Sequence, residues 1–130
     1  MAFDPQTPQG VVAVLSDLDY GIAGSERLAY LTAFLNATAS GNTQLVAAST
    51  GRRIRVIGVV VTNKDSSVVA FKFQSATTDI TSTHDLAADG GGYAAIFSQG
   101  FYCQTAVGEA LNANLGGVGS VGVDVTYVLV

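Results

Sequence analysis

The side chains that could act as nucleophile and base do not assemble into a catalytic set along the chain. A serine-hydrolase triad needs a serine, a histidine and a carboxylate in hydrogen-bonding order. The one histidine, His84, is followed by Asp85, and no Gly-x-Ser-x-Gly nucleophile elbow occurs. Neighbouring side chains of a strand point to opposite faces, so this adjacent pair does not make a triad by itself. We interpret His84 as a solvent-exposed loop histidine.

The single cysteine, Cys103, would act as a nucleophile only if a base such as His84 lay beside it. It stands between Tyr102 and Gln104 in an expected strand, where a buried, apolar thiol is the ordinary role. One cysteine also excludes an internal disulfide bond. We therefore expect that the protein is not an enzyme.

The acidic and glycine-rich segments do not match a metal or phosphate site. Asp85 and Asp89, just before Gly90–Gly92, could bind calcium, but a solvated turn is the simpler interpretation. A zinc site needs about four ligands of the cysteine, histidine or carboxylate type. Gly90–Gly92 lacks the Gly-Lys-Ser/Thr ending and the following helix of a phosphate loop. Gly116–Gly119 precedes an expected strand and not a helix, so it is not a dinucleotide-binding fingerprint. We expect neither a metal ion nor a cofactor.

Three arginines form the one concentration of positive charge. Arg52, Arg53 and Arg55 are half of the six Lys and Arg residues. Arg53 and Arg55 would share one face of a strand. Arginine suits bidentate contacts with carboxylates at interfaces. The cluster is either a solvated strand end that guards an edge or a contact for an acidic partner surface.

The overall composition excludes several partner classes. The 130 residues carry a net charge of −4, with 12% charged and 48% hydrophobic residues. Six cations are too few for the basic stripe that nucleic acid requires. No apolar run is long enough for a membrane span, and Met1–Pro5 does not resemble a signal peptide. A surface this poor in charge is expected to be covered in part by partner subunits.

The first 42 residues differ from the rest and are interpreted as an N-terminal arm. Pro5 and Pro8 favour an extended start. The spacing of apolar residues predicts a short helix over residues 25–35, capped by Ser25. One face of that helix would carry Leu28, Leu31, Phe34 and Leu35. Ala37–Asn42 resembles a linker, and the apolar residues of the arm either join the core or dock on another protein.

From residue 43 onward the pattern indicates β-structure. Arg53–Thr62 is apolar on both faces and is predicted to be a central strand, with Ile54, Val56, Gly58 and Val60 facing one way and Ile57, Val59 and Val61 the other. Val121–Leu129 alternates strictly, as in a half-buried antiparallel strand. About eight short strands without intervening helices predict an antiparallel β-sandwich or jelly roll over residues 43–130.

The segment Phe101–Asn112 carries an aromatic-x-Thr-Ala-x-Gly-Glu-Ala-Leu pattern. The residues of this motif are Phe101, Tyr102, Thr105, Ala106, Gly108, Glu109, Ala110 and Leu111. The pattern and the order of the strands around it resemble those of small virion proteins of tailed bacteriophages, over roughly residues 45–130. In the motif itself, Gly108 is free to adopt positive φ in a turn, and Glu109 would cap backbone donors or meet an arginine.

The resemblance implies a β-sandwich or jelly roll and the function of a capsid decoration or cement protein, which sits as a homotrimer on the outer shell. Its expected partners are the major capsid protein and further copies of the chain. Its expected location is the outer capsid surface of the virion, after assembly in the bacterial host cytoplasm. We expect capsid contacts from apolar residues of the arm and from the arginines: Phe3, Val11, Val12, Val14, Leu15, Leu28, Leu31, Phe34, Arg52, Arg53 and Arg55.

The alternative hypothesis is a receptor- or glycan-binding β-sandwich module of a phage tail or fibre. Such a module would need an exposed aromatic platform. The candidates are Tyr93, Phe97, Phe101 and Tyr102.

Overall fold

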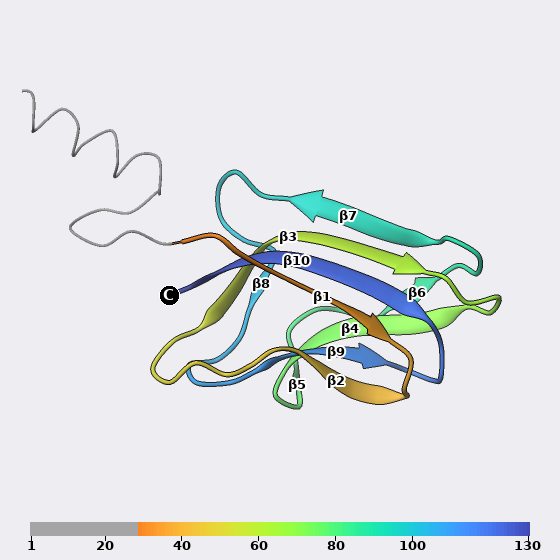
Figure 1. Ribbon diagram of the computed structural model, residues 1–130, viewed down its shortest axis with the longest axis horizontal. Coiled ribbons are helices and arrows are strands. Elements are labelled where there is room, and N and C mark those ends of the chain that lie inside the picture. Colours follow the sequence, from red (N-terminus) through yellow and green to blue (C-terminus); the bar gives the residue numbers. More distant parts are fainter. Residues whose placement is uncertain (1–28) are drawn as a thin grey trace, which may run out of the picture.

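The computed structural model describes residues 29–130, which form ten strands in two antiparallel sheets (Figure 1). We name each sheet after a central strand. The β10 sheet has the order β1 (Leu31–Ala37), β10 (Val121–Leu129), β3 (Ile54–Asn63), β7 (Gly92–Ile96), and β8 (Cys103–Gln104) also pairs with β3. The β9 sheet has the order β2 (Gly41–Val46), β9 (Leu111–Leu115), β4 (Val69–Ser75), β5 (Thr78–Asp79), and β6 (His84–Leu86) also pairs with β4. The predicted all-β sandwich is confirmed.

The hydrophobic core lies between the two sheets and is built by alternation along each strand. Val121, Val123 and Val125 point inward from β10, as their spacing predicts. Phe71 and Phe73 point inward from β4, with their ring centroids 5.0 Å apart in an edge-to-face arrangement. The side chains between these inward positions point away from the core and make up the two outer faces of the sandwich.

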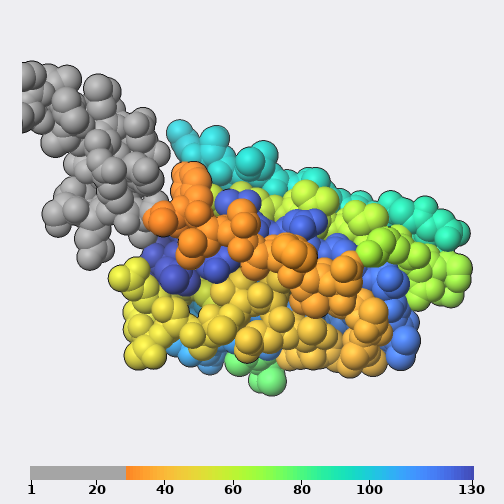
Figure 2. All heavy atoms as spheres, in the orientation of Figure 1, coloured from red at the N-terminus to blue at the C-terminus, as the bar shows by residue number. Residues whose placement is uncertain are grey.

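The predicted helix is wrong for residues 31–35, because these residues lie in strand β1. Every residue of β1 pairs with β10, from Leu31 opposite Tyr127 to Ala37 opposite Val121. Ala37 is fully buried, so the expected linker over Ala37–Asn42 is the end of β1, a tight turn and the start of β2. Figure 2 shows β1 (orange) on the surface of the molecule, alongside the residues of β2 that follow it. Residues 31–42 of the expected arm therefore belong to the sandwich.

A β-bulge changes the inward face of β3 halfway along the strand. Thr126 pairs with Gly58 while Tyr127 pairs with Val56, so Ile57 is the extra residue. Ile54 and Val56 point into the core before the bulge. Val59 and Val61 point into the core after it. The prediction that Ile54, Val56, Gly58 and Val60 share one face is wrong, because the extra residue turns Val60 outward.

Candidate interaction surface

The outer face of the β10 sheet carries exposed apolar side chains among threonines, glycines and a few charged groups. Strand pairing aligns its side chains in three rows: Thr32, Thr126, Gly58 and Ile96; Phe34, Asp124, Val60 and Ala94; Asn36, Gly122, Thr62 and Gly92. Asp124 is the one ionisable side chain in these rows. Phe34 is 78% exposed and Ile96 is 88% exposed. Large apolar side chains that stand out from a sheet face in this way are typical of an interaction site.

A depression of about 410 Å³ is set into this outer face. It is lined by Tyr30, Ile57, Gly58, Ile96, Phe97, Ser98 and Thr126. Gly58 forms its floor, because a glycine in the outward position leaves the space of a side chain empty. A Cβ atom on Gly58 would lie 3.4 Å from Cβ of Thr126, which is an ordinary contact. The depression therefore depends on the glycine and on the bulge beside it.

Arg55 points outward from β3, and two neighbours fix its guanidinium group. Its Nε donates a hydrogen bond of 3.1 Å to Oε1 of Gln104. Its Cζ lies 4.7 Å from the ring centroid of Phe101, in a cation–π contact. Arg52 is exposed and Arg53 is half-buried. Within residues 29–130 no carboxylate forms an ion pair with these three arginines, whereas Lys72 pairs with Asp79 at 2.9 Å.

The residues expected to contact the capsid occupy different regions. Phe34 points outward from β1, the edge strand of the β10 sheet, and Leu31 begins β1 in register with the inward-facing Ala33 and Leu35. Arg52, Arg53 and Arg55 lie before and within β3. The remaining six lie outside the described residues: Phe3, Val11, Val12, Val14, Leu15 and Leu28.

The motif residues link the two sheets. Thr105 is buried, and its Oγ1 accepts a 2.9 Å hydrogen bond from the amide of Ile54 in the β10 sheet. Glu109 accepts a 2.6 Å hydrogen bond from the hydroxyl of Ser75 in the β9 sheet. Gly108 adopts φ +75°, so the positive φ predicted for this turn is confirmed. The expectation that Glu109 caps turn amides or meets an arginine is replaced by its bond to Ser75.

The remaining motif side chains have ordinary packing roles. Leu111 is fully buried in the core, while Ala110 is half-buried and Ala106 is exposed in the turn. Tyr102 packs against the core, and its hydroxyl donates a 3.1 Å hydrogen bond to the hydroxyl of Tyr93. Burial raises the pKa of both tyrosines. Of the four aromatic residues of the glycan-binding hypothesis, Tyr93 and Tyr102 are half-buried with hydroxyls that bond to each other, whereas Phe97 and Phe101 are exposed.

Among the described residues that could do chemistry, the structure brings together one Ser–His pair: the hydroxyl of Ser82 lies 3.5 Å from Nε2 of His84. His84 is not in an exposed loop as predicted; it begins β6, is half-buried and packs 5.0 Å from the ring of Tyr93. Cys103 is buried, and burial raises the pKa of its thiol to about 12. Asp85 is exposed on β6. Over residues 29–130, no three His, Cys, Asp or Glu side chains gather in a way that could hold a metal ion.

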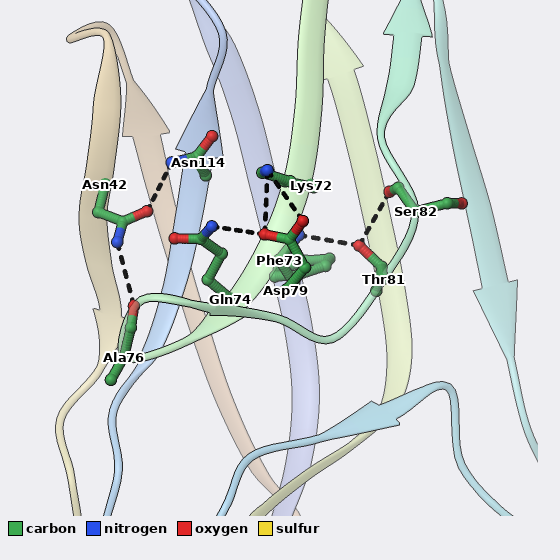
Figure 3. A network of polar contacts seen from close by, with 9 residues as sticks. All are labelled: Asn42, Lys72, Phe73, Gln74, Ala76, Asp79, Thr81, Ser82 and Asn114. Carbon is green, nitrogen blue, oxygen red and sulfur yellow. Dashed lines mark hydrogen bonds and ion pairs between the residues drawn. The ribbon is translucent and has the colours of Figure 1, made fainter.

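The outer face of the β9 sheet is polar, in contrast to that of the β10 sheet (Figure 3). Asn114 donates to Oδ1 of Asn42 at 2.7 Å, and Gln74 donates to Asp79 at 2.6 Å. The hydrogen bond from Gln74, followed by that from Lys72, lowers the pKa of Asp79. Sequence reasoning missed this network. The sequence signal for it is the alternation of polar residues in Asn112-Ala113-Asn114. Pairing of β9 with β2 and β4 aligns these polar side chains with those of the neighbouring strands.

No family model matches the chain, and no curated protein matches it. In the part of the chain that the structure describes, no helix has the length and apolar character needed to cross a membrane.

Proposed function

We propose that the protein is a structural virion protein, a capsid decoration or cement protein that binds the outer shell as a homotrimer and stabilises it. The observation that carries this proposal is the difference between the two outer faces of the sandwich. One face presents Phe34, Val60 and Ile96 to solvent, and the other presents a ladder of amides. A protein attached to a surface needs one face that can be buried and one that stays wet.

Burial of the apolar face would supply part of the binding free energy. Covering a side chain such as Phe34 or Ile96 is worth about 1.5–3 kcal/mol each. Each copy contributes a modest contact, and a trimer multiplies such contacts into tight attachment. The apolar arm residues Val11, Val12, Val14 and Leu15 would add to the area buried on the shell. The major capsid protein is the partner that this arrangement serves.

The polar face would point away from the shell. The donors of Asn42, Asn114 and Gln74 are already used by neighbouring protein oxygen atoms. A face whose polar groups already bond to one another offers few free donors to a partner and little apolar area to bury, so it is suited to remain in water. The glycan-binding alternative finds less support, because two of its four platform candidates, Tyr93 and Tyr102, are half-buried and bonded together, which leaves Phe97 and Phe101 exposed.

The test is a reconstruction of the capsid of the encoding phage, with and without this protein. Density over three-fold positions, lost when the protein is absent, is the expected result. Native mass spectrometry of the purified full chain at micromolar concentration should show a trimer. Particles that look the same without the protein, or density confined to the tail, would contradict the proposal.

A further inference from the structure

The loop between β7 and β8 places an apolar depression and an oriented arginine side by side on the outer face of the β10 sheet. This loop, residues 97–102, begins with Phe97 and carries Phe101 next to its last residue. Phe97 lines the depression, and Phe101 lies under the guanidinium group of Arg55. One loop therefore fixes the position of Phe97, a wall of the depression, relative to Phe101, the ring that supports the guanidinium group.

The guanidinium of Arg55 is prepared to receive a carboxylate. Its Nε is occupied by Gln104, and its plane is held by the ring of Phe101, so its orientation is set before any partner arrives. Orienting a long side chain in advance reduces the entropy that binding must offset. The remaining N–H groups are donors of the forked type that bind carboxylates bidentately. No carboxylate of residues 29–130 takes this place.

The spacing between the two parts matches an extended peptide. Arg55 precedes Ile57, a wall of the depression, by two residues on the bulged part of β3, so their Cα atoms are at most about 7 Å apart. Side chains two positions apart in an extended peptide lie on one face with the same separation. One such peptide could thus present an apolar side chain to the depression and a carboxylate to Arg55 together.

We propose that the depression floored by Gly58 and the oriented guanidinium of Arg55 form one binding site for an extended segment of a partner protein, with a large apolar residue and an Asp or Glu two positions later. Charge complementarity identifies the segment as acidic. The site does not depend on the partner being a shell protein, so it can be tested without capsids.

The probe is the peptide acetyl-Thr-Leu-Thr-Asp-Thr-amide, added to the ¹⁵N-labelled full chain and followed by NMR. We expect saturable shifts of the amides of Arg55, Gly58 and Thr126 at millimolar peptide. A peptide with Asn in place of Asp should bind roughly tenfold more weakly, since it cannot form the charged pair. A peptide with Leu and Asp adjacent should weaken to a similar degree, because the two side chains then point to opposite sides.

Variants of the protein assign the two halves of the site. Arg55→Gln should remove the preference for Asp over Asn, while Arg52→Gln, a cation without the Phe101 and Gln104 contacts, should keep it. Gly58→Leu should fill the depression and abolish binding, while Thr62→Leu, on the same strand and face, should leave it unchanged. If Gly58→Leu does not fold, the comparison of the Leu/Asp peptide with the Asn peptide and the adjacent Leu-Asp peptide on the unaltered protein still tests the proposal.

Three results would overturn the proposal. The first is absence of saturable shifts with the Leu/Asp peptide. The second is an unchanged preference for Asp in Arg55→Gln. The third concerns the chain's own Leu15-Ser16-Asp17: if Asp17→Asn shifts the Arg55 and Gly58 amides without peptide, the occupant is the chain itself and not a partner. Failure of the protein to bind capsids would leave all three readouts unaffected, so the two proposals fail separately.

Discussion

The hydroxyl of Ser75 joins the end of one sheet to the turn that carries Glu109. It donates a 2.6 Å hydrogen bond to the Glu109 carboxylate and accepts a 2.9 Å bond from the amide of Ala106. Ser75 ends β4 in the β9 sheet, and the turn is tied to the β10 sheet through Thr105 and Ile54. The Thr-Ala-x-Gly-Glu motif thus has a structural role in this protein: it fastens the two sheets together at one end.

Replacing Ser75 with alanine should destabilise the fold. The change leaves the amide of Ala106 without its partner and removes the donor to Glu109. Both bonds are partly buried and each contributes about 0.5–1.5 kcal/mol, so losing the two together costs about 1–3 kcal/mol. The free energy of unfolding from urea denaturation should fall by that amount. Ser66→Ala, at an exposed position, is the control and should stay within about 0.5 kcal/mol. Equal effects of the two substitutions would show that the Ser75 bonds contribute nothing.

Asn63 should tolerate no acidic replacement. Its side chain is fully buried, and Nδ2 lies within 3.1 Å of the carbonyl oxygens of Ser67, Leu86 and Ala87. Asn63→Asp would set a carboxylate oxygen against these three acceptors, at an expected cost of about 3 kcal/mol or more. Because protonation restores a donor, the cost should shrink as the pH is lowered toward 4.

The matched control for this change is Asn36→Asp. Asn36 is exposed, and its Oδ1 already accepts a 2.6 Å hydrogen bond from Nζ of Lys64. A carboxylate there faces a cation, so stability should change by less than about 1 kcal/mol. Chemical denaturation of both variants at pH 7 and pH 4 provides the comparison. A cost for Asn63→Asp that does not depend on pH would contradict the assigned role of the Asn63 amide as donor.

Strand β10 was predictable from sequence and β1 was not, for a physical reason. Alternation in Val121–Leu129 is strong because the inward positions are valines and the outward ones are mostly small or polar. In β1 the inward residues include Ala33 and Ala37, which give little apolar contrast, while Phe34 points outward. Leu31, Phe34 and Leu35 therefore mimicked a helical face. Pairing with β10, some ninety residues later, decided the outcome, and local propensity carries no such information.

The candidate surface was only partly predictable. The arginine cluster and Phe34 could be found by residue type. The depression could not, because it arises from the bulge at Ile57, and a strand with apolar residues on both faces gives no sign of where the alternation changes. The support of Arg55 by Phe101 depends on β8 pairing with β3, which is a long-range contact.

The thiol of Cys103 should be unreactive in the folded protein. Its pKa is raised to about 12 by burial, so very little thiolate is present at pH 8. Alkylation by iodoacetamide at pH 8 should be roughly a thousandfold slower than in urea. Fast modification of the native protein would contradict this assignment.

The same burial predicts a pH dependence of stability. A group whose pKa is raised by folding contributes stability below its unfolded pKa of about 8.5, and that contribution is lost as the pH rises toward the folded value. Relative to Cys103→Ala, the unaltered protein should lose about 2 kcal/mol of unfolding free energy between pH 8 and pH 10. The Cys103→Ala variant cancels the titration of the lysines and of the tyrosines other than Tyr93 and Tyr102, whose pKa values are raised mainly by burial and also by Cys103 itself. A difference between the two that stays constant with pH would contradict the raised pKa.

The last prediction concerns where the folded unit begins. The expected division of the chain at residue 42 implies that a fragment of residues 43–130 folds alone. In the structure, such a fragment would lack β1 and the first residues of β2. It would expose the edge of β10 along all seven residue pairs with β1, from Leu31–Tyr127 to Ala37–Val121. An unpaired edge of this length promotes aggregation, and the loss of Ala37 opens the core.

We therefore expect that residues 29–130, which include all ten strands, give a cooperative thermal transition, and that residues 43–130 are insoluble or melt without cooperativity. Circular dichroism and scanning calorimetry of the two purified fragments provide the measurement. The proposed role of the arm in attachment predicts that the 29–130 fragment binds depleted capsids more weakly than the full chain. A cooperative transition in the 43–130 fragment would show that folding does not require β1 and would support the expected domain boundary at residue 42.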